Sequence, residues 1–76
     1  MNDSRRKRLE TASGLITQAI GIIEEVKEEE QESFDNLTTG LQTSEKGEAI
    51  ETTIATLEDA VGALEEADGH ISEAQT

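Results

Sequence analysis

The sequence predicts an all-α fold, in which an antiparallel, coiled-coil-like hairpin of two helices associates into a larger helical bundle. Two series of apolar residues with alternating steps of three and four residues, one in each half of the chain, indicate two long helices that each bury one face. A turn-rich segment lies between them. The chain also lacks proline, tryptophan and tyrosine, and Phe34 is its one aromatic residue, which disfavours a β-sandwich or a conventional globular core.

The first helix is expected over residues 4–34. Its buried face is predicted to consist of Leu9, Ala12, Ile16, Ala19, Ile23 and Val26. Asp3 or Ser4 is expected to cap its N-terminus. Beyond Val26 the series reaches Glu30 and loses its apolar character, so the last turns are expected to form a charged extension.

The hinge is expected over residues 35–43, a stretch that is rich in threonine and contains Asp35, Asn36 and Gly40. Leu37 and Leu41 within it are expected to fold back over the end of the core. The segment is long enough to reverse the chain, so the two helices are expected to lie antiparallel.

The second helix is expected over residues 44–75, with Thr43 or Ser44 as its cap and Glu45 and Glu48 in its first turn. Its buried face is predicted to consist of Ile50, Ile54, Leu57, Val61, Leu64 and Ile71. Asp68 interrupts this series. It either fixes the register of the helices as a polar core residue or marks the place where the bundle opens to water.

Three large apolar residues of the first helix lie outside its predicted buried face: Leu15, Ile20 and Ile22. One partner helix cannot cover so wide an apolar arc. A chain of 76 residues without cysteine is also marginal as an isolated fold. We therefore expect a homo-oligomer that forms through these three residues.

Charge is distributed unevenly along the chain. The formal net charge is −12, but residues 1–8 carry +3 and residues 9–76 carry −15. Such a body repels nucleic acid and anionic membranes and attracts basic protein surfaces, so the expected partner is a host protein with a basic surface. The candidate binding residues are Glu24, Glu25, Glu28, Glu29, Glu32 and Asp35. The alternative is that this run is simply a solvated helix face.

A cluster of basic residues near the N-terminus offers a candidate anion contact, formed by Arg5, Arg6 and Arg8. The alternative is a solvated terminus that balances the acidic body through contacts between subunits. Glycines recur at a spacing of seven residues, at 14 and 21, 40 and 47, and 62 and 69. They indicate either close approach of a partner backbone or tolerated surface positions.

Residues suited to catalysis are scarce, because the chain has no cysteine and one histidine. His70 has Glu66 and Glu73 at helical spacing, but a di-iron pattern needs Glu-x-x-His, and Ala67 stands at that position. We expect no enzyme activity, no metal site and no cofactor. No apolar run is long enough for a membrane span, and no signal peptide is recognisable, so a cytoplasmic location without membrane contact is expected.

Three segments carry a resemblance to a known group: EEEQESFDNL, GLQTSEKGEAIE and TLEDAVGALEEADGHISEA. They are similar to small, largely uncharacterised acidic helical proteins of phages and prophage-like mobile elements. Members usually have Pro-Glu after Asn-Leu, where this chain has Thr38 and Thr39. The resemblance implies a phage or mobile-element origin and supplies no catalytic residue.

The leading functional hypothesis is a non-enzymatic protein that blocks a basic host surface as a counter-defence inhibitor, with its carboxylates imitating DNA. One alternative is an oligomeric sponge that holds a small nucleotide signal at its basic termini. The other is a structural coiled-coil component of the phage.

Overall fold

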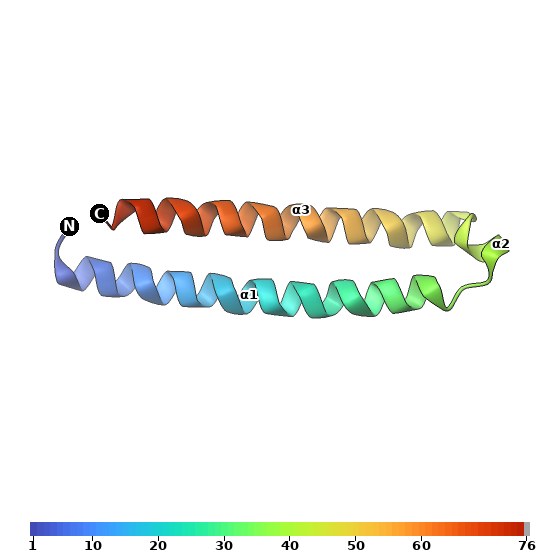
Figure 1. Ribbon diagram of the computed structural model, residues 1–76, viewed down its shortest axis with the longest axis horizontal. Coiled ribbons are helices and arrows are strands. Elements are labelled where there is room, and N and C mark those ends of the chain that lie inside the picture. The colour runs from blue at the N-terminus through green and yellow to red at the C-terminus, as the bar shows by residue number, and fades with distance from the viewer. Residues whose placement is uncertain (76) are drawn as a thin grey trace.

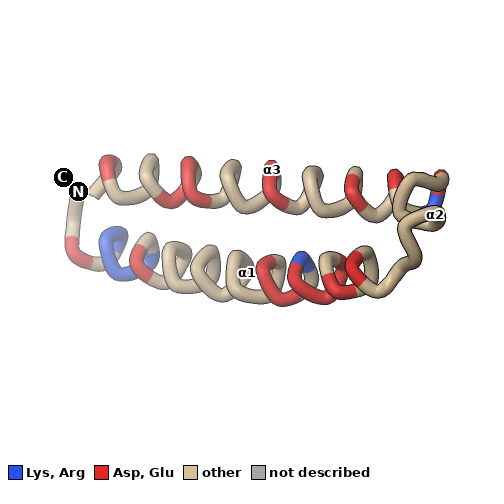
Figure 2. Tube along the Cα trace, turned by 45° about the vertical axis from the view of Figure 1, so that its right-hand side comes forward, with Lys and Arg blue, Asp and Glu red and all other residues tan. Residues whose placement is uncertain are grey.

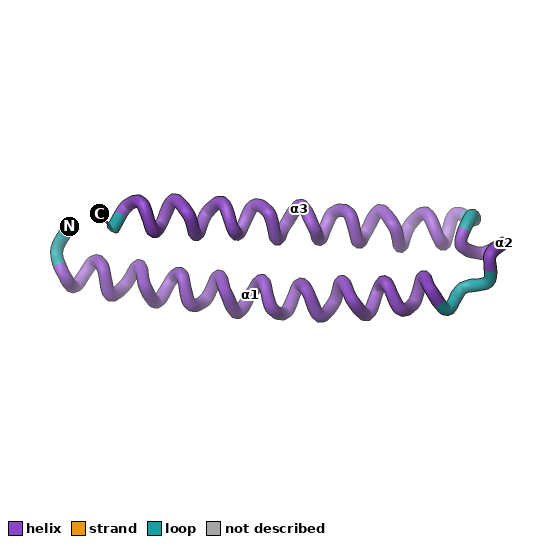
Figure 3. The backbone as a smooth tube through the Cα atoms, in the orientation of Figure 1, coloured by secondary structure: helices purple, strands orange, loops and turns teal. Residues whose placement is uncertain are grey.

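The computed structural model describes residues 1–75 and is an antiparallel helical hairpin (Figure 1). Helices α1 (Asp3–Asp35) and α3 (Glu45–Ala74) lie side by side, and the single turn α2 (Thr39–Gln42) lies in the connection between them. The two ends of the hairpin's chain lie together, opposite α2, and the described residues contain no strand (Figure 3). The predicted all-α hairpin is therefore confirmed. It is a rod with Cα extents of 58 × 15 × 11 Å.

Helix α1 begins one residue before the expected start and ends one residue beyond the expected end. Its cap is Asn2, whose side-chain oxygen accepts a hydrogen bond from the backbone N–H of Arg5 at 2.8 Å. The prediction of Asp3 or Ser4 as the cap is therefore wrong. Asn2 takes the extended backbone of a capping residue, and Asp3 lies in the first turn, where a carboxylate also favours the helix dipole.

The connection is more ordered than a plain hinge. Thr38 caps α2 by accepting a hydrogen bond from the backbone N–H of Leu41, and the side-chain amide of Gln42 donates to the carbonyl of Phe34 at 3.1 Å. These bonds tie α2 back to the end of α1. Of the two leucines expected to cover the core, Leu37 is half-buried, but Leu41 remains 47% exposed.

The start of α3 depends on a glycine. Ser44 is the N-cap residue, as one of the two expected candidates, but its hydroxyl donates to the carbonyl of Leu41 at 2.5 Å instead of accepting from α3. Gly47 is buried in the first turn, and a Cβ built on it would lie 2.1 Å from the carbonyl oxygen of Gln42. Only glycine allows α2 to lie this close to α3.

The contact between the long helices follows two regular series of less exposed residues. The α3 series is the predicted one, with Asp68 included. In α1 the series is Leu9, Ser13, Ile16, Ile20, Ile23, Lys27, Glu30 and Phe34. The predicted α1 series is thus corrected: Ile20 lies in the contact, whereas Val26 is outside it and 40% exposed.

The correction has a chemical cause, because a search for apolar periodicity passes over two polar contact positions of α1, Ser13 and Lys27. Ser13 donates its hydroxyl hydrogen bond to the carboxylate of Asp68. The Lys27 ammonium lies 3.4 Å from Glu24 and 3.7 Å from Glu58. The Lys27 side chain is only 23% exposed, so its aliphatic stem fills the place where an apolar residue was expected.

The core of the hairpin is thin. Within residues 1–75, Val61 at 7% exposure is the one buried large apolar side chain, and the other apolar contact residues are half-buried. Each half-buried side chain gains only part of the roughly 1.5 to 3 kcal/mol of full burial. The isolated hairpin is therefore a marginal fold.

Candidate interaction surfaces

The two flanks of the hairpin differ in chemistry. In an antiparallel helix pair, equivalent flanking positions of the two helices lie on the same side of the contact. On one flank, which we call the acidic side, the positions are Glu10, Thr17, Glu24 and Gln31 of α1 and Glu51, Glu58, Glu65 and Ser72 of α3. Five of these eight residues are glutamates.

The other flank, which we call the uncharged side, carries Ala12, Ala19, Val26 and Ser33 of α1 and Thr53, Ala60, Ala67 and Ala74 of α3. None of these eight residues is charged. One helical position further out, α1 adds Leu15 and Ile22, with Arg8 before them and Glu29 after them, and α3 adds Ala49, Thr56, Ala63 and His70. Over the middle of the hairpin, carboxylates and apolar groups therefore lie on opposite sides.

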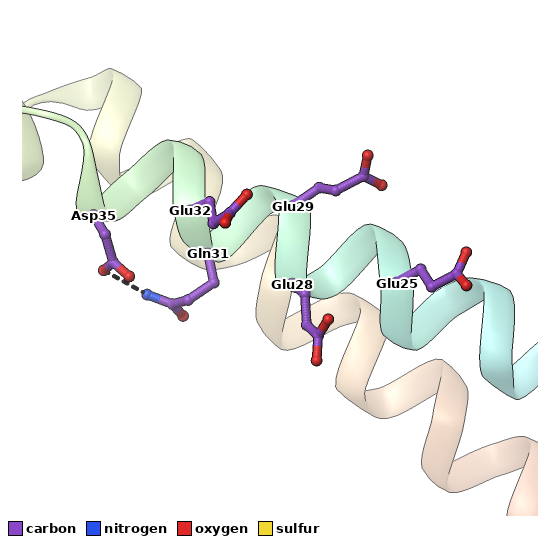
Figure 4. Close-up of a pocket in the computed structure, with 6 residues that line it drawn as sticks. All are labelled: Glu25, Glu28, Glu29, Gln31, Glu32 and Asp35. Atoms are coloured by element: carbon purple, nitrogen blue, oxygen red, sulfur yellow. Dashed lines mark hydrogen bonds between the residues drawn. The ribbon is translucent and has the colours of Figure 1, made fainter.

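The predicted acidic residues gather on the C-terminal half of α1, which is red in Figure 2. A shallow depression there is lined by Glu25, Glu28, Glu29, Gln31, Glu32 and Asp35. Figure 4 shows these side chains extending outward from α1, with the Gln31 amide donating to Asp35 at 3.0 Å. Sequence reasoning did not include Gln31, which was passed over because it carries no charge.

Glu24 stands apart from the other predicted acidic residues. It is half-buried, and its carboxylate lies 3.4 Å from the Lys27 ammonium. Part of its charge is thus balanced within the hairpin, whereas the carboxylates that line the depression face solvent.

The predicted basic residues are divided as well. Arg5 and Arg8 line a shallow depression together with Met1 and Leu9. Arg6 does not line this depression; it is half-buried and its guanidinium lies 3.8 Å from the Asp3 carboxylate. The structure therefore brings two of the three predicted cations together.

The predicted oligomer residues are also divided by the structure. Leu15 is 60% exposed and Ile22 is 62% exposed, while Ile20 is half-buried in the contact with α3. Sequence reasoning missed Val26 as a third exposed apolar residue on this face. The signal that could have found it is its spacing of four residues from Ile22, which continues the exposed stripe.

Five of the six heptad-spaced glycines lie in open space. A Cβ built on Gly14, Gly21, Gly40, Gly62 or Gly69 would meet no atom within 4 Å. Within the hairpin these glycines therefore do not serve the close approach of a backbone, in contrast to Gly47.

Little in the hairpin favours metal chemistry or membrane insertion. The His70 side chain is 70% exposed, and its ring nitrogens lie 3.8 Å from Glu66 and 3.9 Å from Glu73. Among residues 1–75, no three histidine, cysteine or acidic side chains are grouped as a metal site requires. No helix in this part of the chain combines the length and the apolar character that a membrane span needs.

Known proteins provide no template for these surfaces. No protein-family model, curated protein or solved structure matches this chain. The function is therefore inferred from the two sides of the hairpin.

Proposed function

We propose that this chain is a non-enzymatic interaction protein of a phage or mobile element, in which an oligomeric acidic hairpin binds and blocks a basic surface of a host protein. The observation that carries this proposal is the line of outward carboxylates on α1 and along the acidic side. The proposed class is a counter-defence inhibitor that acts in the cytoplasm of an infected or lysogenic bacterial host. Its origin rests on the resemblance of about residues 24–74 to phage and mobile-element proteins.

Electrostatic attraction supplies both speed and selectivity in such binding. A formal charge of −12 is distributed over a rod 58 Å long. This density is below that of duplex DNA, which carries one negative charge per about 1.7 Å of axis. Two hairpins side by side double the density, so an oligomer imitates a nucleic acid more closely than one chain does. A DNA-binding cleft of a defence complex is the kind of surface that fits.

The experiment compares capture of host proteins by the tagged chain from a bacterial lysate at low and high salt. Recovered partners are then purified, and their Kd is measured at several salt concentrations. We expect a basic partner whose affinity falls steeply as salt increases, because exposed charges are screened. A partner with salt-insensitive affinity, or none at all, contradicts the proposal.

Two triple variants separate local charge from net charge. Glu25→Gln, Glu28→Gln and Glu32→Gln together remove three carboxylates from the depression. Asp59→Asn, Glu66→Gln and Glu73→Gln remove three from the outer surface of α3. The two variants have the same net charge, so the first is expected to lose at least tenfold more affinity. Equal losses contradict a role for the α1 carboxylates.

One observation favours a second candidate function, a sponge for a small nucleotide. The depression formed by Met1, Arg5, Arg8 and Leu9 combines two cations with two apolar side chains, as a phosphate and a base require. Calorimetry with purine nucleotides tests it. Binding by the parent chain that is lost in Arg5→Ala/Arg8→Ala and kept in Lys46→Ala supports the sponge, whereas no heat with the parent chain excludes it.

A further inference from the structure

We propose that the uncharged side of the hairpin is a self-association surface, on which a second copy of this chain packs with its α1 antiparallel to the first α1. The product is a four-helix bundle with one two-fold axis. This inference names the surface behind the oligomer of the proposed function. It is tested on the purified chain alone, so it can fail or succeed independently of any host partner.

The apolar groups that need a cover lie on this side. Leu15 and Ile22 are 60% and 62% exposed, and Val26 is 40% exposed, in a hairpin where Val61 is the one large apolar side chain buried among the described residues. A patch of this kind on a marginal fold indicates an interface. A stable dimer of standard size buries roughly 800 Å² per partner. That is a modest part of the hairpin's 5450 Å².

The exposed stripe of α1 is symmetric in its own sequence. Its outermost positions recur every seven residues, at Arg8, Leu15, Ile22 and Glu29. The midpoint of these four positions lies between Gln18 and Ala19. An antiparallel second α1 centred on that midpoint therefore places Leu15 opposite Ile22 and Arg8 opposite Glu29.

Charge selects the antiparallel direction over the parallel one. The basic residues lie at the N-terminal end of α1 and the densest acidic residues at its C-terminal half, with an uncharged stretch between them (Figure 2). An antiparallel contact pairs the basic end of each copy with the acidic half of the other. A parallel contact instead brings Arg8 against Arg8 and Glu29 against Glu29.

Helix α3 has a matching symmetry. Its uncharged residues pair about a midpoint between Ala63 and Leu64, so that Ala60 lies opposite Ala67 and Thr53 lies opposite Ala74. These small side chains permit close approach of the second α3. None of the nine acidic residues of α3 lies at these positions.

The two midpoints lie level with each other across the hairpin. The contacts of Ser13 with Asp68 and of Lys27 with Glu58 set the register between α1 and α3. Interpolation between the two pairs places the α1 midpoint within about one residue, or roughly 1.5 Å, of the Ala63–Leu64 midpoint of α3. A single two-fold axis therefore relates α1 to the second α1 and α3 to the second α3. In this arrangement the acidic sides of both copies face outward.

The surface is tested by sedimentation equilibrium of purified chain from micromolar to about 100 µM, the range in which a modest interface is half-occupied. We expect a mass that rises with concentration towards two copies for the parent chain and for Thr17→Glu, which adds a charge on the acidic side. Ile22→Glu adds the same charge on the uncharged side and is expected to give the mass of one copy with unchanged helical circular dichroism. A monomeric parent chain, any larger assembly, or a dimeric Ile22→Glu variant overturns the proposal.

The orientation is tested by exchanging charges. Arg8→Glu and Glu29→Arg are each expected to weaken the dimer roughly tenfold, because each creates two repulsive pairs related by symmetry. The double variant Arg8→Glu/Glu29→Arg restores both pairs and is expected to regain the parental Kd. Lys7→Glu is the matched control for the added charge, since it lies off the stripe. Single variants that change Kd no more than Lys7→Glu, or a double variant that is not rescued, overturn the antiparallel arrangement.

Discussion

Ser13 of α1 donates a hydrogen bond to the carboxylate of Asp68 of α3, across 55 positions of sequence and in a partly buried place. Asp68 interrupts the apolar series of α3, and Ser13 occupies the α1 contact series at the same level. The Asp68 carboxylate keeps this hydrogen bond in only one register of the two helices, whereas apolar side chains still make contact when one helix slides along the other. The relationship favours the interpretation in which Asp68 fixes the register.

Loss of this bond is expected to cost stability. Ser13→Ala leaves the Asp68 carboxylate partly buried without its donor, which is expected to lower the free energy of unfolding by about 1 to 2 kcal/mol. Urea unfolding at one fixed protein concentration measures it. A double-mutant cycle with Asp68→Ala is expected to show a coupling of at least about 0.5 kcal/mol. Thr17→Ala is the control, because its hydroxyl bonds only to the Ser13 carbonyl within α1; a cycle without coupling removes the role assigned to this pair.

The same pair shows how much the sequence predicts. The all-α hairpin, the α3 contact series and the helix ends to within a few residues follow from apolar periodicity and turn composition. Apolar periodicity does not predict all the contact positions of α1, because Ser13 and Lys27 occupy two of them. Their partners, Asp68 and Glu58, belong to α3 and lie far away in sequence. As a result, Val26 was predicted to lie in the contact and Ile20 outside it, whereas the structure has Ile20 in the contact and Val26 exposed.

The candidate surfaces were predicted less completely than the fold. The acidic run and the exposed Leu15 and Ile22 follow directly from composition and helical spacing. Predicting which residues lie on the acidic side and which on the uncharged side requires the rotation of each helix about its axis. The contacts of Ser13 with Asp68 and of Lys27 with Glu58 define this rotation. The role of Gly47 could not be predicted, because it depends on where α2 packs. Helix α2 is a single turn, and its sequence has no apolar periodicity from which its position could be inferred.

Gly47→Ala is expected to destabilise the hairpin by about 2 kcal/mol or more, because the new Cβ would meet the Gln42 backbone at 2.1 Å and α2 would have to move. Gly62→Ala is the matched control in open space, and it is expected to stabilise α3 by about 0.4 to 1 kcal/mol. Urea unfolding midpoints of both variants check the pair. Equal effects of the two substitutions would show that α2 does not pack closely on α3.

Lys27 is expected to matter more for its stem than for its charge. Lys27→Met keeps the volume at a contact position and is expected to change the unfolding free energy by less than about 1 kcal/mol, since an ion pair whose carboxylate, Glu58, is 59% exposed contributes little. Lys27→Ala removes the stem as well and is expected to cost about 1 to 2 kcal/mol. Thermal unfolding at low and high salt distinguishes the contributions. A Met variant as unstable as the Ala variant would assign the stability to the ion pair.

Self-association also predicts a thermal midpoint that depends on concentration. Unfolding of a dimer releases two chains, so each tenfold increase in concentration stabilises the folded state by about 0.7 kcal/mol per chain, or roughly 3 to 5 °C for a domain of this size. Circular dichroism melts from about 2 to 200 µM measure this. Ile22→Glu, which leaves the hairpin without its second copy, is expected to melt lower and at a midpoint independent of concentration. A parental midpoint that is the same over this hundredfold range would mean that the thin core around Val61 is sufficient by itself.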